Sequence, residues 1–164
     1  MRLLLTALFV LTTARPGPWL GRETVYFCID PSMEQHRSIV TTAFWRWKDL
    51  ISLPAGETQN CNAPRTITYR LAKNMSGPAL AFAPAPMFPE PLAGDVLLDT
   101  WGAWDRQAEW TLAYLLHETG HAFGLEESCM EEDLTCPHTI SPYKLFPSQR
   151  EQRWMRGAYD GIWN

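Results

Sequence analysis

The chain has 164 residues, which is enough for one domain with a substantial hydrophobic core and too short for two ordinary domains. Hydrophobic residues make up 46% of it and charged residues 20%, a globular composition that includes no apolar run long enough to span a membrane. The formal net charge of −4 comes without runs of Lys or Arg. Neither nucleic acid nor a membrane surface is therefore an expected partner, and we expect a monomer.

The N-terminus has the pattern of a secretory signal peptide. Arg2 supplies a basic start, Leu3 to Leu11 is an apolar run, and small residues precede the expected cleavage after Ala14. The pattern predicts a signal peptide over residues 1–14 and a single domain over residues 15–164. A buried first strand or helix is the alternative interpretation of the same stretch. We expect a secreted protein, either extracellular or periplasmic.

The presence of four cysteines, which can form two disulfides, agrees with export, because disulfides persist in oxidising compartments. Four cysteines allow three pairings. We favour Cys28 with Cys61 and Cys129 with Cys136, of which the second closes a short local loop. Free buried thiols are the alternative if the protein is not exported.

The N-terminal half predicts two strands separated by a helix. Residues 24 to 29 and 66 to 71 are rich in β-branched and aromatic residues, which is typical of strands. A helix is expected to open at Ser32, which has capping-box spacing to Gln35, and to end before Pro54. Apolar residues recur through this helix at helical intervals and form one stripe suited to packing on a sheet: Val40, Ala43, Phe44, Trp47, Leu50 and Ile51.

The C-terminal half predicts a short strand and two more helices. Residues 77 to 94 are crowded with Pro, Ala and Gly and predict an irregular surface segment, after which Val96 to Leu98 predicts a strand. A helix is expected from about Gln107 to Phe123, ended by Gly124 in the left-handed conformation. The last helix is expected to begin at Ser148, three residues before a glutamate.

These elements together predict the fold class. Three helices interleaved with about four strands indicate an α+β, or layered α/β, domain. We expect the helices to pack on a small, mixed and mostly parallel sheet.

The predicted helix that ends at Gly124 carries the segment His117-Glu118-Thr119-Gly120-His121. Residues four apart lie on one face of a helix, so both imidazoles can reach one Zn²⁺. Glu118 can contact a water molecule instead of the metal, which suits a general base for peptide hydrolysis by a zinc-activated water. The alternative is that these are ordinary polar residues on an amphipathic helix.

The segment from His117 to Ser128 resembles the extended signature of the metzincin zinc metallopeptidases, in which a Gly reverses the chain three residues after the second His. Gly124 occupies that place. The family has its third metal ligand, a His or in some members an Asp, three residues further on, which implies Glu127 here. Carboxylate is a normal zinc ligand. His138 is the rival third ligand and Glu126 a weaker one, and neither has the family spacing.

From about Thr24 to Gly161 the chain is similar to a small matrixin domain. The resemblance implies that Gly94 to Asp99 is an edge strand that binds substrate, since an exposed edge can pair with an extended peptide. A plain edge strand is the alternative. The family also has a Met beneath the metal, in a turn that Thr139 to Tyr143 resembles with Ile140 in the place of Met.

We therefore predict a secreted zinc-dependent endopeptidase in which His117, His121 and Glu127 hold zinc and Glu118 is the general base. Its expected partner is a protein or peptide substrate bound as an extended strand. The alternative is a catalytically inactive zinc-binding module that holds a protein partner, which would agree with the carboxylate ligand and the missing Met. Glu118 favours the enzyme, because a purely structural zinc site needs no base.

Overall fold

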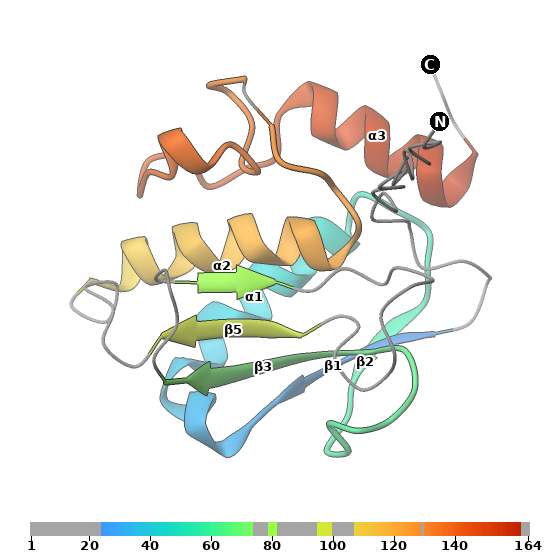
Figure 1. Cartoon of the computed structure of the whole chain (residues 1–164). Coiled ribbons are helices and arrows are strands. Elements are labelled where there is room, and N and C mark those ends of the chain that lie inside the picture. The colour runs from blue at the N-terminus through green and yellow to red at the C-terminus, as the bar shows by residue number, and fades with distance from the viewer. Residues whose placement is uncertain (1–23, 74–78, 82–94, 100–106, 129, 162–164) are drawn as a thin grey trace, which may run out of the picture.

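The computed structural model describes residues 24–73, 79–81, 95–99, 107–128 and 130–161, so the predicted signal peptide lies outside the described residues. Five strands form one sheet in the order β2-β1-β3-β5-β4 (Figure 1). All neighbouring pairs are parallel except β4 with β5, which is antiparallel. The strands are β1 (Val25–Ile29), β2 (Ala55–Glu57), β3 (Thr66–Ala72), β4 (Ala79–Ala81) and β5 (Val96–Asp99).

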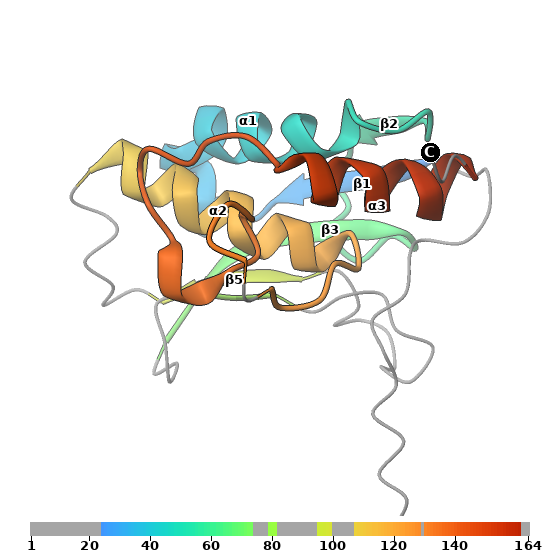
Figure 2. The ribbon, with the colours of Figure 1, turned by 90° about the horizontal axis from the view of Figure 1, so that it is seen from above.

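The three α-helices of the described chain are α1 (Arg37–Lys48), α2 (Ala108–Ala122) and α3 (Gln149–Asp160), and the 3-10 helices are η1 (Pro31–His36) and η3 (Pro137–Thr139). Helices α1 and α2 lie side by side and contact the sheet, whereas α3 lies beyond α2 as seen from the strands (Figure 1 and Figure 2). Within the described ranges, every helix is too short or too polar to cross a bilayer. The predicted class, three helices on a small, mixed and mostly parallel sheet, is confirmed, with five strands in place of about four.

The hydrophobic core lies between this sheet and the first two α-helices. Strand β1 alternates, so Val25, Phe27 and Ile29 face the helices while Tyr26 faces outward. Phe44 of α1 packs on Phe27 with ring centroids 4.5 Å apart. The apolar stripe predicted for the first helix supplies much of the core, because four of its members are completely buried: Val40, Ala43, Phe44 and Trp47.

The prediction that the strand within Gly94 to Asp99 lies at the edge of the sheet is wrong. Strand β5, which contains the predicted strand Val96 to Leu98, lies inside the sheet between β3 and β4. The described sheet has its edge on this side at β4, Ala79–Ala81, from a segment that the sequence predicted to be irregular. Three residues without β-branched or aromatic side chains, flanked closely by prolines, give no strand signal, so pairing with β5 decides the conformation instead of local propensity.

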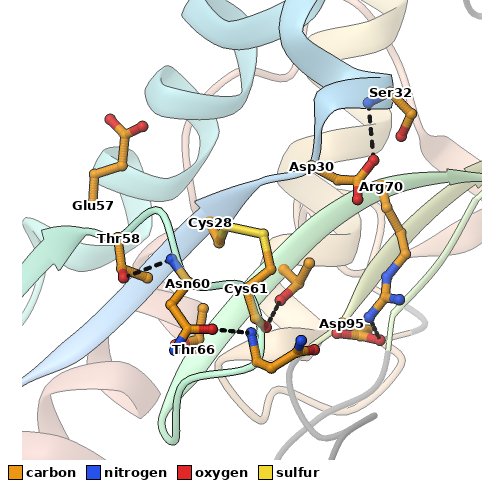
Figure 3. The surroundings of a disulfide bond; sticks show 12 residues. Cys28, Asp30, Ser32, Glu57, Thr58, Asn60, Cys61, Thr66, Arg70 and Asp95 are labelled. Carbon is orange, nitrogen blue, oxygen red and sulfur yellow. Dashed lines mark hydrogen bonds and ion pairs between the residues drawn. A yellow bond between two sulfur atoms is a disulfide. The ribbon is translucent and has the colours of Figure 1, made fainter.

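The first disulfide pairing is confirmed: Cys28 of β1 is bonded to Cys61, with Cα atoms 5.1 Å apart (Figure 3). This bond ties the sheet to the loop between β2 and β3, where the Cys61 carbonyl also accepts a hydrogen bond from Thr68. Cys136 is a buried free cysteine. Its expected partner, Cys129, lies outside the described residues, so the second pairing stays a prediction.

Helix boundaries follow their capping residues. The first helical segment begins six residues before α1, as the 3-10 helix η1. The Asp30 side chain caps η1 by accepting a hydrogen bond from the Ser32 N–H, so Ser32 is not the cap. The capping box at the start of α3 is present as predicted, with the Ser148 side chain bonded to the Glu151 N–H and the Glu151 side chain to the Ser148 N–H. Gly124 ends the helical segment with φ 92°, also as predicted.

Candidate metal centre

Helix α2 is buried along most of its length, which gives its polar residues fixed surroundings. Thr119 forms a hydrogen bond at 3.0 Å with the hydroxyl of Tyr69, on β3. On the side facing α1, the Leu116 carbonyl accepts a hydrogen bond of 2.8 Å from Trp47 Nε1. Buried hydrogen bonds to the sheet and to α1 therefore fix the position of α2 close to His117.

The two histidines of the helix converge on one point. His117 is almost completely buried, His121 is partly exposed, and their rings meet edge to face with centroids 4.7 Å apart. Their Nε2 atoms are 3.2 Å apart. Two nitrogens about 2.05 Å from a tetrahedral zinc ion would stand roughly 3.3 Å apart, so this spacing fits a shared ion.

Both histidines use Nδ1 to hydrogen-bond a backbone carbonyl. His117 Nδ1 lies 2.7 Å from the Leu134 oxygen, and His121 Nδ1 lies 2.8 Å from the Leu125 oxygen. A carbonyl only accepts hydrogen bonds, so each Nδ1 carries a proton, and Nε2 is the nitrogen left to bind a metal. This is the arrangement found around metal-ligating histidines, whose second nitrogen donates to a carbonyl or a carboxylate.

The immediate surroundings keep His117 neutral. Burial, together with the charge of a protonated His121, lowers the pKa of His117 to about 4, although the hydrogen bond to Leu134 opposes the shift. A neutral imidazole is the form that binds a metal. Near neutral pH, His117 therefore needs no deprotonation before it can act as a ligand.

Glu127 completes a group of three possible metal ligands. Its carboxylate oxygen lies 3.7 Å from His121 Nε2, and ligand atoms of His117, His121 and Glu127 all lie within 4.8 Å of one another. In the described part of the chain this is the single group of three His, Cys, Asp or Glu side chains with such spacing. His138, the rival, is exposed on η3, and neither it nor Glu126 belongs to the group.

The three side chains suit zinc in type and number. Two imidazole nitrogens and one carboxylate oxygen form a donor set used by zinc enzymes, which leaves a fourth position for water or substrate. The Glu127 side chain is 63% exposed, so the carboxylate can adjust toward an ion at little cost in packing. The residues present therefore fit a zinc ion.

Glu118, next in sequence to the first histidine, is buried on α2, with 6% of its surface exposed. It directly follows His117 in the sequence and is not a member of the ligand group.

A buried glutamate of α3, which the sequence analysis noticed only as a helix cap, also belongs to these surroundings. Glu151 accepts hydrogen bonds from the N–H groups of Leu134 and Thr135, at 3.0 and 2.9 Å. The carbonyl of the same Leu134 receives the His117 hydrogen bond. No local sequence signal joins residues so far apart in the chain.

A pocket of about 290 Å³ adjoins the exposed side of the ligand group. It lies between the segment after Gly124 and helix α3. Its lining includes the carboxylates of Glu126 and Glu127, the Arg150 guanidinium and the indole of Trp154. A molecule bound in it would therefore touch a proposed metal ligand.

No protein-family model and no curated protein matches this chain. Among solved structures it is similar to the structure of myroilysin, with a TM-score of 0.53 and 15% sequence identity. The match covers 73% of this chain and 55% of that chain, so the part matched is about half of the myroilysin chain. At this identity the likeness shows the fold alone, and it agrees with the predicted α+β fold class. The resemblance to metzincins, and to matrixins in particular, stays a prediction.

Proposed function

We propose that the protein is a secreted zinc-dependent endopeptidase. His117, His121 and Glu127 hold the zinc ion, and Glu118 is the general base. Substrate is a protein or peptide in extended conformation.

The pair of histidine nitrogens carries this proposal. With a proton on each Nδ1, the Nε2 atoms of the two rings lie 3.2 Å apart. Two lone pairs at that distance repel each other unless a proton on one nitrogen or a metal ion lies between them. A bound metal ion would therefore account for the close approach of the two Nε2 atoms, which ordinary helix packing does not explain.

The chain's own residues then account for the chemistry. Zinc, when bound here, supplies Lewis acidity, which makes water more acidic and polarises a peptide carbonyl. Glu118 takes a proton from the attacking water as the new C–O bond forms, and returns it to the leaving amine as the C–N bond breaks. Burial of the Glu118 carboxylate limits competing water around it.

Substrate binding is assigned to strand β4. It is the last strand of the described sheet, and its outer side is not paired with another described strand. β4 lies beside α2, the helix that carries the two histidines (Figure 1). An extended peptide that pairs with β4 would extend the sheet and run along the metal site.

Export is supported by the sequence of the N-terminus and by the disulfide between Cys28 and Cys61. Expression of the whole chain in a secreting host, followed by sequencing of the mature N-terminus, tests it. We expect a mature chain that begins at Arg15. An uncleaved protein retained in the cytosol would contradict export.

The decisive experiment measures zinc content and peptide cleavage in the same preparations. Wild-type protein should hold about one zinc per chain and cleave unfolded protein substrates. Glu118→Gln should keep the zinc and lose cleavage by about 100-fold or more, because the amide cannot accept the proton. Glu109→Gln, an exposed position in the first turn of the same helix, is the matched control and should retain both properties.

The outcomes separate the proposal from its rival. Zinc binding without any cleavage by the wild-type protein would favour the inactive binding module. A wild-type protein that binds no zinc when zinc is supplied would exclude both.

A further inference from the structure

The Glu151 side chain of helix α3 lies close to the metal centre. Only 2% of Glu151 is exposed, and its carboxylate accepts four hydrogen bonds. One comes from the Ser148 N–H at 2.8 Å and completes the helix cap. The other three come from outside the helix: the N–H groups of Leu134 and Thr135, and the Thr135 hydroxyl at 3.0 Å.

The peptide that Glu151 holds is the one that orients a histidine. Leu134 donates its N–H to Glu151 Oε2 at 3.0 Å, and its carbonyl accepts the His117 Nδ1–H at 2.7 Å. The three residues thus form a continuous chain of hydrogen bonds from α3 to α2. Each of the linking groups is buried, so water does not replace these bonds easily.

Neighbouring contacts fix the same segment on both sides. The buried Asp133 carboxylate accepts hydrogen bonds from the Ser148 hydroxyl and from Arg150, both near the start of α3. Thr135 lies against α2 at Gly120, where an added Cβ would come within 3.0 Å of the Thr135 methyl carbon. The segment 133–135 is therefore clamped between the two helices.

We propose that Glu151 is a positioning residue for the metal centre: it holds the Leu134 carbonyl where that oxygen fixes the tautomer and direction of the His117 ring. This role rests on the proposed zinc site, although it does not require that the protein be a peptidase. Glu151 itself does not touch the metal.

The role requires a carboxylate. Oε1 accepts both Thr135 groups, and Oε2 accepts the N–H groups of Leu134 and Ser148, so all four partners are donors. Glutamine has the same shape but one acceptor oxygen, and its NH₂ group would face two donors. Glu151→Gln therefore keeps the side-chain volume but loses the hydrogen bonds to one of the two carboxylate oxygens, which leaves buried donors unsatisfied.

The test compares Glu151→Gln with Tyr159→Phe. Tyr159 is also on α3 and donates a hydrogen bond of 2.8 Å to the Phe123 carbonyl near the end of α2, away from Leu134. Zinc affinity is measured by competition with a chelator, and the His117 tautomer of the zinc-free protein by nitrogen NMR of the imidazole ring. We expect Glu151→Gln to weaken zinc binding by about 10- to 100-fold and to give a mixture of His117 tautomers. Tyr159→Phe should weaken docking of α3 and leave zinc affinity and tautomer unchanged.

If Glu151→Gln does not fold, Glu151→Asp takes its place. Aspartate keeps a negative charge at the start of the helix, but shortening by one methylene draws the carboxylate about 1.5 Å away from Leu134 and Thr135. The same changes in zinc affinity and tautomer are expected, in smaller degree. A folded Glu151 variant with wild-type zinc affinity and a single Nδ1–H tautomer would overturn the proposal. Because neither readout depends on cleavage, that result is distinct from an inactive Glu118 or an inactive wild type.

Discussion

Trp47 of α1 lies against Gly120 of α2 so closely that a Cβ atom at position 120 would be 2.8 Å from Trp47 Cζ2. The indole cannot move away freely, because its Nε1–H donates to the buried Leu116 carbonyl. On another side, the methyl of Thr135 would be 3.0 Å from the same Cβ. The glycine between the two histidines is therefore required by packing between helices.

We expect Gly120→Ala to destabilise the protein by about 1–3 kcal/mol, because the methyl group overpacks a rigid contact. The loss should outweigh the gain in helix propensity of alanine over glycine, which is about 1 kcal/mol. Urea unfolding measures the change. Gly56→Ala is the control, since its Cβ would meet nothing closer than the Tyr26 ring at 3.9 Å. Equal unfolding midpoints for wild type and Gly120→Ala would contradict the packing argument.

The parts of this site that lie within one helix could be predicted from the sequence. The spacing of His117 and His121 places both rings on one face in any helix, and Gly124 takes the left-handed conformation that was expected of it. The capping box of Ser148 and Glu151 is equally local. Each of these depends on the helical repeat and not on the rest of the fold.

The parts that depend on distant contacts could not be predicted. Ala79–Ala81 becomes the edge strand through pairing with β5, although its own residues have little strand propensity. Ala55–Glu57 follows the predicted helix and was not predicted to be a strand, but it is strand β2 because it pairs with β1. The bridge from Glu151 through Leu134 to His117 likewise exists only after two helices have packed together.

The disulfide between Cys28 and Cys61 should contribute measurably to stability. It joins residues separated by 33 positions, and closing a loop of that length in the unfolded chain corresponds to about 3–4 kcal/mol in the loop-entropy model. We expect the double variant Cys28→Ala/Cys61→Ala to lose stability of that order in urea unfolding. The metal ligands are on other elements, so zinc stoichiometry of the folded variant should stay at wild type. A reducing agent that leaves the wild-type unfolding midpoint unchanged would contradict this contribution.

Glu127 should be the third ligand, and His138 should not. Removing the carboxylate leaves two ligands, so Glu127→Ala should weaken zinc binding strongly, by about 100-fold or more. His138→Ala is the matched control because His138 is also exposed, in η3, but lies outside the ligand group. Competition with a chelator at fixed pH measures both affinities. Loss of zinc from His138→Ala, with Glu127→Ala unchanged, would show that the histidine is the ligand.

The zinc-free protein should lose stability as the pH falls, partly through His117. Burial lowers the folded-state pKa of His117 to about 4, compared with about 6.5 in an unfolded chain. Between these values the unfolded chain binds the proton and the folded protein does not, so the contribution is fully present above pH 6.5 and is lost as the pH falls toward 4. At most about 3 kcal/mol is lost in this way. Proton NMR of the His117 ring gives the folded-state pKa directly, and urea unfolding between pH 7 and pH 4 gives the slope, which should be shallower in His117→Asn. A His117 ring that titrates near pH 6.5 in the folded, zinc-free protein would show that its surroundings do not hold it neutral, and the slope should then be the same in both proteins.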